Sequence, residues 1–112
     1  MRQPDATRLR HMIEAADTVA RLVEKRRRED LDLDQTLALA LTRAIEIFGE
    51  AASRTSAELQ VATPQVPWSE IIGMRNRLVH AYFDIDHDIV WKAATEEIPA
   101  LLPPLRALLP KD

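Results

Sequence analysis

Residues 36–52 read TLALALTRAIEIFGEAA, and their apolar side chains recur at steps of three and four residues. This spacing places the apolar side chains along one side of a helix, so the stretch predicts an amphipathic helix that packs against others. We expect the helix to cover about residues 34–59. Gly49 inside it indicates either a close approach of another helix or a tolerated surface glycine. The stripe consists of Leu37, Leu41, Ala44, Ile45, Phe48 and Ala52.

The helical period continues on both sides of this stretch. Toward the N-terminus it predicts a helix that Asp5 caps and that runs to about Arg28, with its apolar stripe between residues 9 and 23. After a loop at residues 61–67, Pro67 suits the first turn of a third helix, expected over residues 68–81. A fourth helix follows, capped by Asp84 or Asp86 and kinked or interrupted at three prolines. These prolines are Pro99, Pro103 and Pro104.

Four long helices with short connections predict an all-α fold, an antiparallel up-down helix bundle of four main helices with a kinked, Pro-interrupted C-terminal helix. No segment alternates at period two over a useful length, which disfavours strands. The 112 residues fit one compact domain, 1–112. Two domains would each have only about 50–60 residues, a size at which a single core becomes marginal.

Composition excludes several classes of protein. The chain has no cysteine, which excludes disulfides, thiolate metal sites and a cysteine nucleophile. Fifteen basic against 18 acidic residues give a net charge of −3, whereas proteins that coat nucleic acid carry a basic excess. No apolar run approaches the ~20 residues that span a bilayer, and the first residues lack a signal-peptide pattern, so we expect a cytoplasmic protein with no membrane contact. The basic run KRRR at residues 25–28 is either the solvated end of the first helix or a local phosphate-facing patch.

Three histidines are the candidates for proton transfer. We expect His11 to be a surface residue of the first helix. His87 lies among Asp84, Asp86 and Asp88, a combination that could bind a metal, but aspartates are also common caps and first-turn residues of helices. We favour capping, and we predict no metal site.

His80 differs from the other two because of its neighbours in MRNRLVHAY, residues 74–82. On a helix with about 100° per residue, Arg75 falls about 40° from Ile71, inside the expected apolar face. A buried unpaired guanidinium is costly, so Arg75 needs an anion, a carboxylate partner or a water-filled groove. One candidate partner is Glu46 or Glu50 on the second helix, although both could be plain surface residues. Asn76 and His80 share the opposite, polar side.

Arg75, Asn76, His80 and Tyr82 form a pattern that resembles the Arg-x4-His-x-Tyr signature of the HEPN superfamily. The continuation FDID at residues 83–86, the IVW that follows, and the last helix with its proline are similar to the HepT-like branch. The likeness extends over the whole bundle pattern and is specific over about residues 67–99.

This resemblance implies a metal-independent endoribonuclease toxin, with no cofactor, that is encoded beside a minimal nucleotidyltransferase antitoxin of the MNT type. It also implies a homodimer in which two Arg/His motifs meet at a shared cleft. RNA supplies its own nucleophile, the 2′-OH, so the implied catalytic residues need only move a proton (His80) and hold the phosphate (Arg75). Asn76 would orient the His80 ring or donate to phosphate, and Arg77 would contact the RNA backbone or be a solvated surface residue. The implied products are a 2′,3′-cyclic phosphate and a 5′-hydroxyl.

On one continuous helix, Arg75 and His80 would point about 140° apart. We therefore expect the homodimer, formed through the motif face of the third helix, to bring Arg75 of one chain to His80 of the other. In the HepT-like branch the motif tyrosine is implied to accept AMP from the antitoxin, and here this residue is Tyr82. The alternative for Tyr82 is a core aromatic residue.

Two other classes of function remain open. The chain could be a non-catalytic, nucleotide- or partner-binding subunit of a nucleotidyltransferase, or a structural dimerisation bundle. We expect Trp68 and Trp91 to be core or interface anchors, with base stacking as the alternative.

Overall fold

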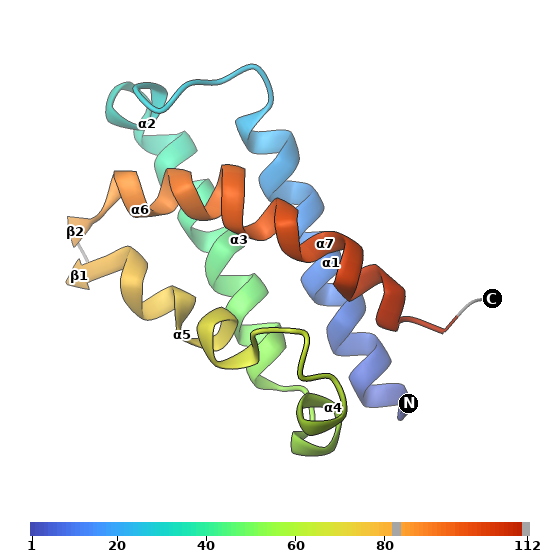
Figure 1. Ribbon diagram of the computed structural model, residues 1–112. Coiled ribbons are helices and arrows are strands. Elements are labelled where there is room, and N and C mark those ends of the chain that lie inside the picture. Colours follow the sequence, from blue (N-terminus) through green and yellow to red (C-terminus); the bar gives the residue numbers. More distant parts are fainter. Residues whose placement is uncertain (82–83, 111–112) are drawn as a thin grey trace.

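The computed structural model describes residues 1–81 and 84–110, and the prediction of an all-α helix bundle is confirmed. Helix α1 packs along α3, and α3 packs on its other side against α5. A C-terminal helical run crosses from α3 to α1 and covers both (Figure 1). The main helices are α1 (Gln3–Val23), α3 (Gln35–Ser53) and α5 (Trp68–Leu78). The C-terminal run consists of α6 (His87–Lys92), η1 (Ala93–Glu97) and α7 (Ile98–Leu108).

The helices enclose one hydrophobic core cluster. The apolar stripe of residues 36–52 lies in its middle, where Phe48 is fully buried. Every main helix contributes to the cluster, because each has an apolar stripe whose burial removes apolar surface from water. Among the described residues, no helix is both long and apolar enough to cross a bilayer. Other fully buried side chains are Leu9, Met12, Leu41, Ile45, Ile71, Leu78, Ile98 and Leu105.

Helix α1 ends earlier than predicted, at Val23 instead of Arg28. Lys25 takes a positive φ of 60°, and the backbone N–H of Arg27 donates to the Asp30 carboxylate at 2.7 Å. This local side-chain acceptor competes with helix continuation. The short helix α2 (Asp30–Leu33) follows.

The start of α1 also differs from the prediction, because Asp5 is not its cap. The helix begins at Gln3, and Asp5 lies buried in its first turn. The Asp5 carboxylate accepts hydrogen bonds from the backbone N–H of Ser56 at 2.8 Å and from its hydroxyl at 2.6 Å. Asp5 therefore joins the start of α1 to a segment 51 residues away.

The predicted helix over residues 34–59 is divided into α3 and the short α4 (Ala57–Ala62). Hydroxyl groups at the break replace helical hydrogen bonds: Ser53 Oγ donates to the Glu50 carbonyl and Thr55 Oγ1 to the Ala52 carbonyl. Ser56 then caps α4, since its hydroxyl accepts from the backbone N–H of Leu59 at 3.0 Å. Helix α4 thus occupies the start of the predicted loop at 61–67.

Gly49 marks a close approach of two helices, one of the two interpretations left open by the sequence. A Cβ at this position would lie 3.2 Å from the carbonyl oxygen of Ile71 on α5. Gly49 therefore lets α5 approach α3 more closely than a larger residue would allow.

Helix α5 ends at Leu78 and not at residue 81, and a small hairpin follows that the sequence did not predict. Strand β1 (Val79–Ala81) pairs antiparallel with β2 (Asp84–Ile85), and Val79 lies opposite Ile85. The backbone N–H of Asp86 donates to the Leu78 carbonyl at 2.8 Å and ties the end of α5 to the start of α6. Strands this short carry no readable alternation, which is why periodicity missed them.

The C-terminal run stays helical through its prolines but widens in front of the first. At residues 93–97 the helix adopts π geometry, and the Ile98 N–H reaches back to the Ala93 carbonyl. A wider turn relieves the contact of the Pro99 ring with the preceding carbonyl and accommodates its missing donor. Pro103 and Pro104 lie inside α7. Asp86 caps the run, as predicted, and accepts from the Ile89 N–H at 3.1 Å.

Candidate active site

Helix α5 presents Arg75 and Asn76 on its exposed side. Its buried side chains are Trp68, Ile71, Met74 and Leu78. The expectation that Arg75 lies inside the apolar face is therefore wrong, since its side chain is 51% exposed. Helical periodicity gave the orientation of Arg75 relative to Ile71, but the packing of α5 decided which side is covered.

Arg75 and Asn76 line a groove of about 530 Å³ between α3 and α5. Arg43 on α3 contributes a second guanidinium, and Ile85 of β2 closes the end next to the hairpin. The groove is open to solvent, and it combines two cations with an amide. These groups suit the binding of a phosphate, because guanidinium N–H groups pair well with phosphate oxygens. The remaining lining residues are Leu39, Thr42 and Glu46.

Glu50 is the carboxylate that pairs with Arg75, and it was one of the two predicted candidates. Its Oε1 accepts from Nη1 of Arg75 and from Nη1 of Arg43, both at 3.3 Å. All three side chains are at least one third exposed, so each ion pair is weak, of order 0–1 kcal/mol. An incoming phosphate can therefore displace Glu50 from either arginine at little cost.

Arg77 lies apart from this groove. Its Nη2 donates to the Glu70 carbonyl at 3.1 Å, and its Nη1 lies 3.7 Å from Glu97 on η1. It lines a separate cavity beside Met74 and Leu101. The structure thus brings Asn76, but not Arg77, together with Arg75.

The backbone of His80 lies in β1, directly after α5. The helical-wheel separation of about 140° between Arg75 and His80 therefore does not describe the molecule, because α5 ends before His80. The neighbour of His80 in the strand, Val79, pairs with Ile85, which lines the Arg75 groove. The side chain of His80 and all of Tyr82 fall outside the described residues.

Arg43 is the cationic groove residue that the sequence reasoning missed. It lies seven residues before Glu50, which is two helical turns, and so on the same side of α3. That spacing was available in the sequence, but nothing in it identified Glu50 as the residue that would meet α5.

The other two histidines lie outside this groove. His11 is exposed on α1, as predicted. Nδ1 of His87 lies 2.8 Å from Oδ1 of Asp32 on α2, and this contact and Arg28 lower the pKa of the Asp32 carboxyl. Within residues 1–81 and 84–110, no three His, Cys, Asp or Glu side chains gather in a way that could hold a metal ion.

The basic run at residues 25–28 is partly neutralised by carboxylates. Arg28 donates to Asp88 at 2.6 Å and to Asp32 at 3.0 Å, and Arg26 lies 3.7 Å from Asp34. The run follows the end of α1, and it joins α1 to α2 and α6.

The two tryptophans have the predicted place in the core. Trp68 is buried, and its indole N–H donates to the Thr63 hydroxyl at 2.9 Å. Trp91 is half-buried against the hydrophobic cluster.

Comparison with known proteins decides the family. The family model described as ribonuclease HepT-like matches residues 12–108, a range that includes the whole groove and the motif. The chain belongs to the ribonuclease HepT-like family. This membership supports RNA cleavage as the general activity.

The HepT-like chain is also similar to curated proteins whose names assign them a ribonuclease activity and mark that assignment as provisional. It is 34% identical to an RNase of Caldanaerobacter subterraneus subsp. tengcongensis over 93% of both chains. It is 40% identical to a ribonuclease HepT of Thermococcus cleftensis, over 65% of this chain and 66% of the relative. An RNase of Methanocaldococcus jannaschii is 38% identical over 61% of this chain and 62% of its own. No solved structure gave a significant match.

Proposed function

We propose that this HepT-like protein is a metal-independent endoribonuclease toxin in which Arg75 and His80 are the catalytic residues. The observation that carries the proposal is the open groove in which Arg75 and Asn76 lie beside the strand that bears His80. The family of the chain supports RNA as the substrate.

The chemistry requires only groups of this kind. An imidazole of His80 takes the proton of the ribose 2′-OH, and the 2′-oxygen attacks the adjacent phosphorus. The bond from phosphorus to the 5′-oxygen breaks, and that oxygen takes up a proton to leave as a 5′-hydroxyl, while the other fragment ends in a 2′,3′-cyclic phosphate. Arg75 and the amide of Asn76 stabilise the negative charge that grows on the phosphate oxygens.

A homodimer completes the site in this proposal, with Arg75 of one chain facing His80 of the other. This arrangement is the one that the resemblance to the HEPN superfamily implies, and mixing of inactive variants tests it.

Silencing would occur at Tyr82, by transfer of AMP from a cognate MNT-type nucleotidyltransferase antitoxin. An added AMP brings a negative phosphate and a bulky base close to the motif, where the substrate phosphate must bind. The mass of the chain expressed with its gene neighbour tests this step, because Tyr82 is the only tyrosine. An increase by whole AMP units at Tyr82 is expected, and an unmodified Tyr82 in a silenced toxin would exclude it.

The experiment that tests the activity is cleavage of RNA by the purified protein in EDTA. We expect cleavage with 2′,3′-cyclic phosphate ends, and a loss of at least 100-fold in both His80→Ala and Arg75→Ala at unchanged helicity. The control is Arg77→Ala, because Arg77 lies outside the groove and is expected to retain most of the activity. An RNA that stays intact with wild-type protein would favour the alternative, a non-catalytic binding subunit.

A further inference from the structure

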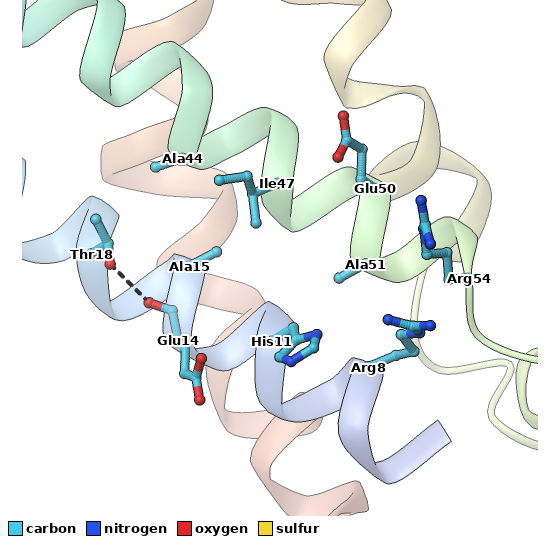
Figure 2. A pocket seen from close by; sticks show the side chains of 10 residues that line it. All are labelled: Arg8, His11, Glu14, Ala15, Thr18, Ala44, Ile47, Glu50, Ala51 and Arg54. Carbon is cyan, nitrogen blue, oxygen red and sulfur yellow. Dashed lines mark hydrogen bonds between the residues drawn. The ribbon is translucent and has the colours of Figure 1, made fainter. Parts of the chain in front are cut away.

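A second groove lies between α1 and α3, and the proposed reaction does not use it. It has a volume of about 400 Å³ and is drawn in Figure 2. Arg8 and His11 reach into it from α1, and Arg54 reaches into it from the end of α3. The groove therefore gathers two guanidinium groups and an imidazole from two helices.

The two guanidinium groups and the imidazole of this groove have no carboxylate partner among the described residues. Arg8, His11 and Arg54 form no ion pair there, in contrast to Arg43 and Arg75, which share Glu50. Arg8 lines the groove from α1, and Arg54 lines it from the end of α3 (Figure 2). Guanidinium groups without a carboxylate partner are suited to pair with phosphate oxygens.

Two acidic residues, Glu14 and Glu50, also line this groove, but neither forms an ion pair with Arg8 or Arg54. The Glu14 carboxylate points away from α3 (Figure 2). Glu50 is already paired with Arg43 and Arg75. Among the described residues, the Arg8 and Arg54 guanidinium groups in the groove therefore have no carboxylate partner.

The floor of the groove is formed by small side chains. Ala15 on α1 faces Ala44 and Ala51 on α3, so no long side chain fills the space between the helices. Ile47 lies at the edge of the groove and is 39% exposed, which offers an apolar surface to a ribose or a base. A shallow channel that presents unpaired arginines and an apolar edge is suited to a single nucleic-acid strand.

We propose that this groove binds the phosphodiester backbone of single-stranded RNA on one side of the bond that is cut. The inference rests on the proposed function and extends its substrate contacts. Glu50 lines this groove and also pairs with Arg75, so the two grooves meet at this residue on α3. A strand whose scissile phosphate lies at Arg75 can continue along the exposed side of α3 to Arg8 and Arg54. Each guanidinium donates to a phosphate oxygen, and the contacts are independent of sequence.

The test measures binding and does not require cleavage. The probe is a fluorescein-labelled 12-nucleotide single-stranded DNA, which lacks the 2′-OH and so cannot be cut by the proposed reaction. We compare the wild type with Arg8→Gln/Arg54→Gln by fluorescence anisotropy at several salt concentrations. The matched control is Arg10→Gln/Lys92→Gln, which removes two exposed positive charges that lie outside the groove and form no ion pair with a described residue.

We expect the groove variant to bind the probe at least tenfold more weakly than the wild type, and the control to bind less than threefold more weakly. Loss of two phosphate contacts also lowers the slope of log K against log salt by about 1.4. Equal losses in both variants, at unchanged circular dichroism, would overturn the proposal. Competition by free AMP as effective as that by unlabelled 12-mer would also overturn it, since the groove would then hold a mononucleotide.

The outcome separates this inference from the proposed function. If Arg8→Gln/Arg54→Gln cleaves RNA normally and binds the probe as the wild type does, the proposal of RNA binding in the second groove is wrong. The proposed catalytic roles of Arg75 and His80 are then unaffected. If the wild type binds the probe strongly through this groove but cuts no RNA, the proposed nuclease activity is wrong. The proposal of strand binding in the second groove is then supported.

Discussion

Asp5 is the one charged side chain among the buried described residues, and it holds two distant segments together. Its carboxylate accepts two hydrogen bonds from Ser56, which in turn caps α4. The hydrogen bond from the Ser56 hydroxyl lowers the pKa of the Asp5 carboxyl, against the opposing effect of burial. A lowered pKa means that the ionised form stabilises the fold.

We predict that Asp5→Asn lowers the free energy of unfolding by about 1–3 kcal/mol at pH 7, because a buried hydrogen-bonded carboxylate is lost. The stabilisation by Asp5 is complete above about pH 5, where the carboxyl is ionised in both states, and it is lost as the pH falls through the lowered pKa of the folded state. Urea unfolding of both proteins between pH 2.5 and pH 7 measures the effect. The difference between them should shrink in acid, and a constant difference would contradict the role of the charge.

The two glycines form a matched pair for testing helix packing. A Cβ at Gly49 would meet the Ile71 carbonyl at 3.2 Å, whereas a Cβ at Gly73 would meet nothing within 4 Å. We expect Gly73→Ala to raise the free energy of unfolding by about 0.5–1 kcal/mol through helix propensity. Gly49→Ala should lower it by about 1 kcal/mol, because α5 must move away from α3. Thermal unfolding of both variants checks this, and equal gains would show that α3 and α5 are not in close contact at Gly49.

At the scale of elements, the start of α6 depends on Asp86. Its side chain caps α6 and its backbone N–H bonds to the last residue of α5. Asp86→Ala should lower the free energy of unfolding by about 1 kcal/mol, and Asp86→Asn should retain most of the stability because asparagine caps as well as aspartate. Chemical denaturation measures both, and an equal loss in the two variants would argue against capping.

The existence of the main helices was predictable, but several of their ends were not. A stripe such as that of residues 36–52 depends only on the period of the sequence. The ends depend on competition by individual polar groups. The Asp30 carboxylate accepts from a backbone N–H after α1, whereas the hydroxyls of Ser53 and Thr55 donate to backbone carbonyls at the end of α3. The end of α5 depends on pairing with β2, a partner that the local sequence does not specify.

The candidate site was predictable as a set of residue types, but not as a geometry. The motif identified Arg75 and Asn76, and both line one groove. The exposure of Arg75 could not be predicted, because it depends on how α5 rests on Ile71 and Met74. Arg43 was missed because it comes from another helix, and only the fold brings it to Arg75.

At the scale of the whole molecule, an acidic chain carries two grooves that are lined by arginines. The net charge of −3 disfavours general adhesion to nucleic acid. Two grooves on α3 nevertheless present arginines, and Glu50 lies between them. This arrangement suits a protein that holds one RNA strand along a defined path rather than coating RNA.

The proposed active site takes Arg75 from one chain and His80 from the other, so inactive variants should complement each other. Arg75→Ala and His80→Ala each leave a homodimer without a complete site. A mixed dimer has one site that lacks both residues and one that is intact. Random exchange of subunits should therefore restore about one quarter of the wild-type activity.

The most direct measurement is RNA cleavage in EDTA by the wild type, by each single variant, and by their mixture after subunit exchange. We predict cleavage by the wild type, none by either variant alone, and a return to about one quarter of the wild-type rate in the mixture. A mixture that stays inactive, although native mass spectrometry detects the mixed dimer, would contradict a site built from Arg75 and His80 of two chains.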